Sequence, residues 1–336
     1  MPDSHRNVTI KEVAAQAGVS VATISRVLNG KGPVRETTSR RVIETCQALH
    51  FTPHPIARSL SLRRTHTIGL LLPDLHGEFF SEVIRGIDAA ARRTGYHLLV
   101  SGFHSDRQEM IAVFRALRGR VDGLIVMSPD REAAKLCSNL PSGFPLVLLN
   151  SVAEATRAIT MDNYGGACAM VRHLQSLGHR RIAFIKGPEQ NADAAGRLRG
   201  YRETVQEIVE LQGDFSEESG YAAGASLMAM LRQPTAVFAA NDAMAIGALS
   251  AFRETGVRVP QDIALTGFDD IPIARYVTPP LTTVSVDIAQ LGRRAFDLLL
   301  HGLNEPGGEQ THERLPATLV VRESCGSKIV RGGAKS

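Results

Sequence analysis

The first stretch of the chain repeats its apolar positions with the period of an α-helix. Ile10 and Val13 lie on one helical face, and Thr9 stands three residues before Glu12, which is the spacing of a capping box. Gly18 follows as a residue that readily ends a helix. The pattern therefore predicts a short helix between Thr9 and Gly18.

A second helix is predicted after a turn of only four residues, "AGVS" (17–20). Ser20 is in position to cap this helix, and Ile24, Val27 and Leu28 form one apolar stripe along it. A third helix is predicted from about residue 36 to 49, and its expected apolar side consists of Val42, Ile43, Ala48 and Leu49. Two helices joined by so tight a turn are typical of the helix-turn-helix unit, whose second helix enters the major groove of DNA.

Beyond residue 66, apolar runs alternate with amphipathic segments. The predicted strands of the first half are "HTIGLLLPD" (66–74), "YHLLVSGF" (96–103), "VDGLIVMSP" (121–129) and "PLVLLNS" (145–151), with helices at 79–94 and 107–119. The pattern then restarts, with helices at 164–178 and 195–208, strands at 181–187 and 263–270, and a strand followed by a helix in 236–256. This alternation predicts a doubly wound parallel sheet that is used twice.

Composition places the chain among soluble globular proteins and excludes several other classes. Of its 336 residues, 43% are hydrophobic and 21% are charged. No apolar run approaches the roughly 20 residues that a membrane span needs, and the polar start "MPDSHRNVTIKEVA" is unlike a secretory signal. The cysteines are far apart, as expected for reduced thiols rather than a metal site: Cys46, Cys137, Cys168 and Cys325. We therefore expect a cytoplasmic protein with no membrane segment and no metal.

The charge is distributed unevenly along the chain. Residues 1–66 hold ten Lys or Arg against four Asp or Glu, so this head carries about +6 while the rest carries about −2. A basic head on a slightly acidic body favours contact with a polyanion, and a merely solvated basic terminus is the alternative.

The segment that joins head and body has its own pattern. Pro53 and Pro55 interrupt the third helix, and "PIARSLSL" (55–62) has room for one or two helical turns. So short a helix is marginal in water and forms only when DNA or a paired copy stabilises it. Leu60 would then be exposed on a DNA-facing segment, where it suits a wedge in the minor groove; linker packing is the alternative.

Residues 8–60 resemble the head of the LacI/GalR (lactose-repressor) family of bacterial transcription regulators. The resemblance is carried by T-I-x-x-V-A-x-x-A-G-V-S, by T-x-S-R-x-L-N, and by "ARSL", which is similar to the family's minor-groove hinge helix. It implies a homodimer on a pseudo-palindromic operator, with Leu60 as the intercalating wedge. The predicted DNA-binding residues are Thr9, Ser20, Val21, Ala22, Thr23, Ser25, Arg26, Asn29, His54, Ala57, Arg58 and Leu60.

Within the second helix these residues have different expected partners. Arg26 suits a guanine edge, and Thr23 is expected on a phosphate. Val21 and Ala22 occupy the two positions that vary in the family and tune operator choice. Their small apolar side chains permit close approach to the groove floor and contact with a thymine methyl group.

Polar residues stand at the ends of the predicted strands of the body. In parallel sheets these ends line the crevice where ligands bind, although Asp and Asn there are also frequent helix caps and turn residues. Acids, amides and a nearby arginine suit a polyhydroxylated or purine-like ligand, and phenylalanine rings suit stacking on it.

The family resemblance covers nearly the whole chain and assigns this site more closely. It implies ligand contacts from the segments "GEFF", "LVLLNS", "DAAGRLRGY", "GDFSEESGY", "AANDAMAIGA" and "LTGFDD". The predicted effector-binding residues are Phe79, Phe80, Asn150, Asp193, Arg197, Phe215, Asn241 and Asp269, of which Asp193 occupies a variable position.

The expected architecture is an all-α helix-turn-helix head and hinge helix joined to a periplasmic-binding-protein-like body of two doubly wound parallel-sheet subdomains. The expected divisions are 1–52, 53–65, 66–326 and a polar tail at 327–336. Within the body, residues 66–160 with 286–314 form one subdomain, and 161–285 with 315–326 form the other. Residues 279–300 cross back to the first subdomain, and 315–324 form a closing strand. The tail has no heptads, so a dimer is expected, with the helix from Phe79 as its surface.

Three functions are compatible with at least part of this sequence. A ligand-controlled repressor of carbohydrate genes, with a sugar effector between the subdomains, accounts for both head and body, and a purine or nucleoside is the alternative effector. A sugar-binding transport protein would match the body alone and leaves the head unexplained. An enzyme is disfavoured, because the sequence has no phosphate-binding loop, no nucleophile elbow and no His/carboxylate cluster at metal spacing.

Overall fold

The computed structural model describes residues 8–29, 32–51, 64–104, 106–128, 143–151, 156–305, 307 and 311–327. The chain divides into two compact units, residues 1–67 with 119–122 and residues 68–118 with 123–336. No helix in these described ranges is both long and apolar enough to cross a membrane.

The described part of the first unit contains three helices, α1 (Ile10–Ala17), α2 (Val21–Asn29) and α3 (Glu36–Ala48). The capping box at α1 is formed in both directions, because Thr9 N–H donates to the Glu12 carboxylate at 2.7 Å and Glu12 N–H donates to Thr9 Oγ1 at 3.4 Å. Gly18 ends α1 with φ 61°, in the left-handed region that glycine adopts without strain. The helix-turn-helix prediction is confirmed.

The core of this unit lies between the three helices. Its buried residues are Val13, Ala14, Ala17, Ile24, Val42 and Cys46. The predicted apolar side of α3 was partly wrong, because Ile43 is 46% exposed and Ala48 is exposed, while Cys46 is buried. The buried side of α3 follows Val42, Cys46 and Leu49, which are spaced as one helical face; Ile43 is rotated by about 100° from Val42.

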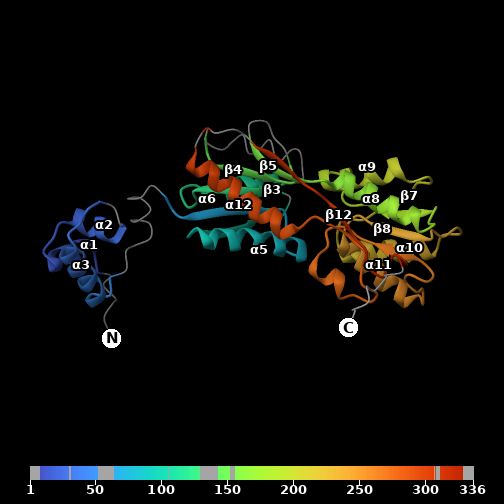
Figure 1. The fold of residues 1–336 in the computed structure, drawn as a ribbon, viewed down its shortest axis with the longest axis horizontal. Helices are drawn as coiled ribbons and strands as arrows, with labels where there is room; N and C mark the ends of the chain where they lie inside the picture. Colours follow the sequence, from blue (N-terminus) through green and yellow to red (C-terminus); the bar gives the residue numbers. More distant parts are fainter. Residues whose placement is uncertain are drawn as a thin grey trace, which may run out of the picture. The chain divides into compact units, whose positions relative to one another are not determined.

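The second unit contains two parallel sheets (Figure 1). The first has the strand order β11-β5-β4-β3-β1-β2, and its pairings from β1 through β3, β4 and β5 to β11 are parallel. Its strands are β1 (Thr67–Leu72), β2 (His97–Gly102), β3 (Gly123–Met127), β4 (Leu146–Leu149), β5 (Arg157–Met161) and β11 (His312–Leu315). Among the described residues, its helices are α5 (Glu78–Arg93), α6 (Arg107–Leu117) and α12 (Ile288–Asn304).

Helices α5 and α12 approach each other closely at two glycines. A Cβ atom on Gly86 would lie 2.2 Å from the carbonyl oxygen of Ala289, and one on Gly292 would lie 2.4 Å from that of Val83. Only residues without a side chain permit this approach. The late helix α12, predicted to cross back to the first half, is thereby packed on α5.

The second sheet has the order β7-β6-β8-β9 and is parallel throughout. Its strands are β6 (Ile182–Ile185), β7 (Val209–Leu211), β8 (Ala236–Ala239) and β9 (Ala264–Thr266). Figure 1 shows α8 (Asn163–Ser176) and α9 (Ala192–Thr204) on one side of this sheet, and α10 (Glu217–Met228) and α11 (Asp242–Glu254) on the other. Because both faces are covered, β6 and β8 are buried along their whole length.

Short elements complete the unit and correct two predictions. The closing strand predicted at 315–324 is instead two strands, β11 in the first sheet and β12 (Thr318–Val320), which pairs antiparallel with β10 (Thr283–Ser285). Pro316 separates them, since proline cannot donate a ladder hydrogen bond. The helix predicted at 195–208 begins earlier, because Asn191 caps α9, and ends at Thr204 ahead of β7. A 3₁₀ helix, η2 (Pro272–Arg275), follows β9.

Candidate functional site

The two sides of α2 face different surroundings. Ile24 is fully buried in the core of the first unit, and Val27 and Leu28 pack against that core. The opposite side leaves Val21 40% exposed and Ala22 and Arg26 exposed. A helix held by one side and open on the other is the form that a major-groove recognition helix requires.

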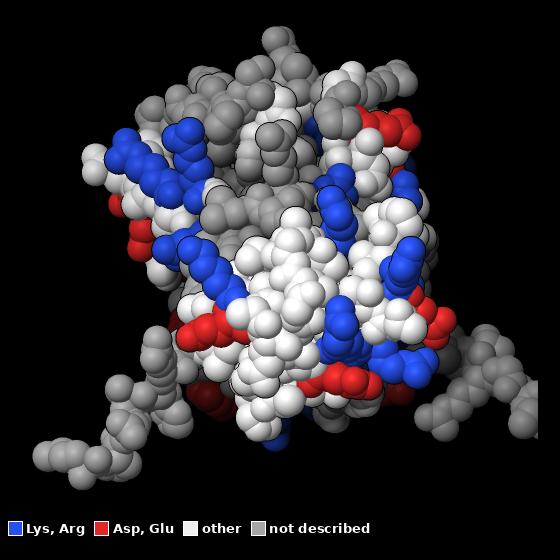
Figure 2. All heavy atoms as spheres, turned by 90° about the vertical axis from the view of Figure 1, so that its left-hand side faces the viewer, with Lys and Arg blue, Asp and Glu red and all other residues white. Residues whose placement is uncertain are grey.

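Ser20 fixes the start of α2. Its hydroxyl accepts a hydrogen bond from Thr23 N–H at 3.2 Å and lies 3.0 Å from the Thr23 hydroxyl. Figure 2 looks toward the side of the molecule that is on the left in Figure 1 and shows Lys and Arg side chains spread over that face. The exposed basic residues of the described part of the first unit include Lys11, Arg26, Arg35, Arg40 and Arg41.

Several predicted DNA-binding positions fall outside the described structure. Residues 52–63 are not described, so the predictions for His54, Ala57, Arg58 and Leu60 lie outside the described residues. Asn29 is the last residue of α2, and its side chain is likewise not described. The described candidates are Thr9, Ser20, Val21, Ala22, Thr23, Ser25 and Arg26.

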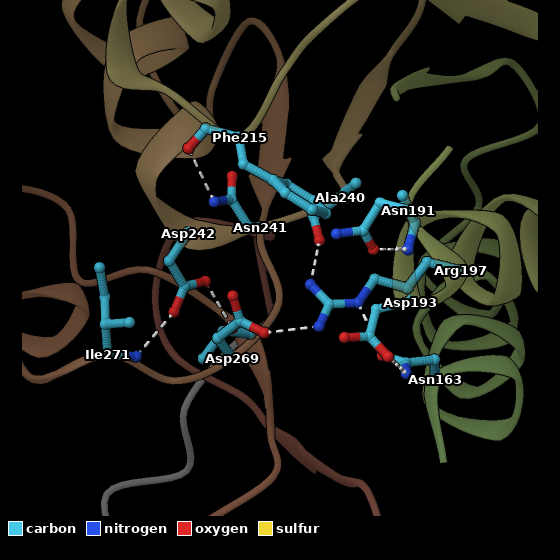
Figure 3. A network of polar contacts seen from close by, with 12 residues as sticks. Asn163, Asn191, Asp193, Arg197, Phe215, Ala240, Asn241, Asp242, Asp269 and Ile271 are labelled. Carbon is cyan, nitrogen blue, oxygen red and sulfur yellow. Dashed lines mark hydrogen bonds and ion pairs between the residues drawn. The ribbon is translucent and has the colours of Figure 1, made fainter. Parts of the chain in front are cut away.

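Arg197, on α9, is the centre of a buried polar cluster in the second unit (Figure 3). Its side chain is almost fully enclosed, and each of its three nitrogens has a partner. Nε donates to Asn163 Oδ1 at 2.8 Å, Nη1 donates to the Ala240 carbonyl oxygen at 2.6 Å, and Nη2 lies 2.8 Å from Asp269 Oδ1. The last contact is an ion pair between the guanidinium and the Asp269 carboxylate.

Two aromatic rings flank this guanidinium. Its central carbon lies 3.9 Å from the centre of the Phe268 ring and 5.7 Å from that of Phe215. Phe215 reaches this position because Gly187 leaves room for it: a Cβ atom there would lie 2.5 Å from the ring. The guanidinium is therefore held by contacts with the two rings as well as by the partners of its nitrogens.

Two buried carboxyl groups share the cluster with Arg197. Burial raises the pKa of Asp193 to about 6; the charge of Asp269 adds to this effect, and Arg197 and Asn163 oppose it. Burial likewise raises the pKa of Asp269 to about 6 against the opposing effect of Arg197. Asn163 Nδ2 donates to Asp193 Oδ1 at 2.7 Å. Near neutral pH the cluster combines one permanent cation with two carboxyl groups close to their titration range.

Asn150 brings a polar group from the first sheet to this cluster. It follows β4, adopts φ 57° and is 4% exposed. Its side chain is one of the groups that lower the pKa of Asp193 on α9, so side chains from the two halves of the unit meet here. Asn150 Oδ1 is buried without a hydrogen-bond partner among the described residues.

Asn241 has a different environment from the other predicted ligands. Its Oδ1 caps α11 by accepting from Met244 N–H at 3.0 Å, and its Nδ2 donates to the Phe215 carbonyl oxygen at 2.9 Å. Both polar atoms are thus bonded within the protein. The bonds hold the start of α11 and the backbone of Phe215 together, which makes Asn241 a positioning residue as well as a predicted ligand.

Phe79 and Phe80 begin α5 as half-buried rings, 5.7 Å apart and at an interplanar angle of 89°. No described contact joins either ring to Arg197. The predicted effector-binding set lacks two residues of this cluster, Asn163 and Phe268. Phe268 stands beside Asp269 in the segment already singled out, whereas Asn163 follows β5, a strand that the sequence analysis did not identify. The described residues contain no cluster of His, Cys, Asp or Glu suited to a metal.

Comparison with known proteins agrees with this arrangement. The model of bacterial regulatory proteins of the lacI family matches residues 9–54, and that of a periplasmic binding protein-like domain matches residues 171–325. An HTH-type transcriptional repressor PurR of Edwardsiella ictaluri is 36% identical over 94% of this chain and 96% of its own length. The ribose operon repressor of Escherichia coli is 35% identical over 94% of this chain and 99% of its own length.

Solved structures of regulators of this kind are also similar to this chain. The lac repressor dimer bound to operator and the anti-inducer ONPF matches with a TM-score of 0.86 and 32% identity, over 95% of this chain and 99% of that one. A LacI-family regulator from Enterococcus faecium with bound ribose matches with a TM-score of 0.70 and 28% identity, over 77% of this chain and 98% of that one.

The chain belongs to the lacI family of bacterial regulatory proteins. It is a ligand-responsive, DNA-binding transcriptional repressor. The predicted fold, a helix-turn-helix head with a periplasmic-binding-protein-like body, is confirmed. Because the relatives are repressors, the prediction of a regulator rather than an enzyme is confirmed too.

Proposed function

We propose that the cluster around Arg197 binds a small neutral sugar as the effector of this repressor. The buried acceptor Asn150 Oδ1 lacks a hydrogen-bond donor among the described residues, and this observation carries the proposal. A buried acceptor without a donor is costly, and a sugar hydroxyl entering between the two halves supplies the missing donor. The proposed ligand residues are Phe79, Phe80, Asn150, Asp193, Arg197, Phe215, Asn241 and Asp269.

Charge favours a neutral ligand over an anion. Asp193 and Asp269 flank the single guanidinium of Arg197, which is already paired with Asp269. A carboxylate or phosphate on the ligand would meet these two acids, whereas hydroxyl groups can donate to them. The ribose operon repressor and the ribose-bound regulator among the similar proteins support a sugar. The PurR relative supports the second candidate, a purine or nucleoside stacked on a phenylalanine ring.

A thermal-shift screen tests the effector class. Ribose and other neutral sugars are compared with purines and nucleosides, and the effector is expected to raise the melting temperature by mass action. Arg197→Ala should abolish this shift, measured against the variant's own unliganded melting temperature. Arg199→Ala is the matched control on the same helix, because Arg199 is exposed and stacks on Tyr164 instead. A shift that survives in Arg197→Ala would place the effector elsewhere.

For DNA, we propose that the exposed side of α2 reads a pseudo-palindromic operator as part of a homodimer in the bacterial cytoplasm. The proposed contacts are Thr9, Ser20, Val21, Ala22, Thr23, Ser25, Arg26 and Asn29, with His54, Ala57, Arg58 and Leu60 from the hinge. The proposed division is a head at 1–52, a hinge at 53–65 and an effector-binding and dimerisation body at 66–326. The lac repressor dimer on its operator supports this assembly.

The dimer surface is proposed along α5 and the neighbouring sheet edge. Strand β2 is the edge strand there and leaves Leu99 38% exposed, while Leu75 is 48% exposed. In the other half, η2 exposes Ile273 and is followed by Tyr276, which is 73% exposed. Exposed apolar side chains of this size suit contact with a second copy of the chain.

The proposed mechanism is linkage between the effector site and the hinge. The effector changes how the two halves of the body close, which changes the spacing of the paired hinge segments and hence their helical order on DNA. The hydrogen bond from Ile273 N–H to Glu78 Oε2, at 2.9 Å, joins the two halves and is suited to change with such closure.

A further inference from the structure

Arg157 is a second buried arginine of the body, outside the Arg197 cluster. It is the first residue of β5, and its side chain is buried with the residue only 6% exposed. Its Nε and Nη2 atoms are enclosed and have no hydrogen-bond partner among the described residues, and no described Asp or Glu forms an ion pair with it. A buried guanidinium with two unpaired N–H groups is costly, because neither its charge nor its donors are compensated.

The guanidinium packs against the last turn of α12. A Cβ atom on Gly302 would lie 2.7 Å from Arg157 Nη1 and 3.2 Å from Cζ, so only glycine leaves room for the group here. The C-terminal end of a helix carries a partial negative charge of about half a unit, which favours a cation at this place. Half a charge does not balance a full one, and Nε and Nη2 still lack acceptors among the described residues.

The unpaired edge of Arg157 is the edge with which other arginines of this chain bind carboxylates. Arg202 donates through Nε and Nη2 to the two carboxylate oxygens of Glu210, at 2.7 and 2.9 Å. Arg294, on α12, binds Glu313 through the same two atoms, at 3.1 and 2.6 Å. The two N–H groups of this edge form a planar fork that matches two oxygens of one oxyanion.

We propose that Arg157 is the centre of a second ligand site, which binds a small oxyanion through Nε and Nη2. The ligand group is a phosphate or a carboxylate, because both present two oxygens at the spacing of this edge. Such a group supplies at once the counter-charge and the two acceptors that the described residues lack. Because both donor atoms are enclosed, the anion reaches them when the last turn of α12 opens, and the ends of helices open more readily than their interiors.

This site is separate from the proposed effector site. Arg157 pairs with Val147 near the amino ends of β5 and β4. Asn163, which holds Arg197, follows the carboxyl end of β5. The five residues of β5 span roughly 13 Å, so the two sites lie at opposite ends of the strand. The proposal therefore does not depend on which effector the Arg197 cluster binds.

Inorganic phosphate is the first probe, and the full chain is used. Its melting temperature is measured at low millimolar phosphate and in chloride of equal ionic strength. The melting temperature of the wild type should rise with the logarithm of the phosphate concentration, as expected for a single site. A parallel series with acetate distinguishes a phosphate ligand from a carboxylate one by which anion acts at the lower concentration. Stabilisation by neither anion would overturn the proposal.

Substitutions of Arg157 locate the site. Arg157→Lys keeps the cation and loses the planar fork, so the shift caused by the anion should fall to about half or less. Arg157→Met removes both, so the shift should vanish. Arg314→Gln is the matched control, because Arg314 lies on the neighbouring strand β11 with an exposed side chain, and it should retain the wild-type shift.

Phosphate also stabilises proteins by its exclusion from their surface, and that effect does not depend on residue 157. Equal shifts in the wild type and in both Arg157 variants would therefore overturn the proposal. The lysine variant keeps a cation at this position, so its comparison with Arg314→Gln decides the question even if the methionine variant does not fold.

Hydrogen exchange followed by mass spectrometry locates the anion independently. With phosphate, exchange should slow in the peptides that contain the end of α12 and the start of β5, because the bound anion holds the helix turn closed. The same peptides of Arg157→Lys should show a smaller change. Slowing that is confined to other peptides would place the anion elsewhere and contradict the proposal.

Discussion

On α2, Val21 and Arg26 are exposed to solvent, whereas on α9 Arg197 is 2% exposed and each of its three nitrogens has a partner. The first site presents side chains on a helix that other residues hold in place. In the second, the candidate ligand residues themselves hold the structure together. A change on the exposed side of α2 should therefore alter binding alone, and a change in the cluster should alter stability and binding together.

The sharpest contrast is expected from Arg197→Ala. The substitution leaves Asp193 and Asp269 buried without their cation, and breaking a buried pair in this way typically costs about 3–5 kcal/mol. The loss should be smaller at pH 5 than at pH 7.5, because both carboxyl groups have pKa values raised to about 6 and take up protons between these values. Urea unfolding of the variant and the wild type at the two pH values measures this loss of stability.

Arg199→Ala provides the comparison on the same helix. Removal of its exposed side chain should change the free energy of unfolding by no more than about 0.5 kcal/mol at either pH. Equal losses for the two arginine variants would show that the cluster does not stabilise the fold and would remove the contrast with α2.

A smaller effect is expected from Asp193→Asn. Because the folded-state pKa of Asp193 is raised to about 6 from its ordinary value of 3.8, the wild type loses stability relative to asparagine as the pH rises from 4 to 7. The free energy of unfolding of the variant minus that of the wild type should rise over this range by up to about 3 kcal/mol. Urea titrations at half-unit pH steps check the sign, and a difference that falls over the same range would refute it.

Changes on α2 are expected to have the smallest effect on stability and to appear in DNA binding instead. Arg26→Ala should weaken binding to an operator selected from random pseudo-palindromic DNA by about 1–3 kcal/mol, the usual value of a bidentate guanine contact. Val21→Ala should cost less, and Val21→Gln should change which operator is preferred. Melting temperatures should stay near that of the wild type in all three variants. Fluorescence titrations with operator variants measure the binding.

Loss of stability in Arg26→Ala would show that its side chain supports the fold. An unchanged operator preference in Val21→Gln would remove the proposed role of that position in specificity.

The sequence predicted the elements whose signals are local. Thr9, Gly18 and Ser20 act within a few residues of themselves, so the head could be outlined from their spacing. Long apolar runs identified most buried strands. Strands of three to five residues such as β5, β7, β10 and β12 were missed or merged, because their pairing depends on partners far along the chain.

The candidate site could likewise be predicted only in part from the sequence. The family's motifs pointed to Arg197 and Asp269, which the structure brings to 2.8 Å of each other. They did not reveal that Asn163 holds Arg197 Nε, or that both polar atoms of Asn241 are bonded within the protein. Such bonds depend on how separate helices pack, and a single sequence carries no direct signal for them.

The buried thiol of Cys46 has a practical consequence. It lies in the core of the first unit, and burial raises the pKa of its thiol, so the folded head protects it from alkylation in two ways. Its rate of labelling therefore reports how often the head opens. Cys168 and Cys325, both buried in the second unit, report on the body in the same sample. Mass spectrometry of the labelled peptides can thus follow the opening of each unit of the unmodified repressor, with and without DNA or effector.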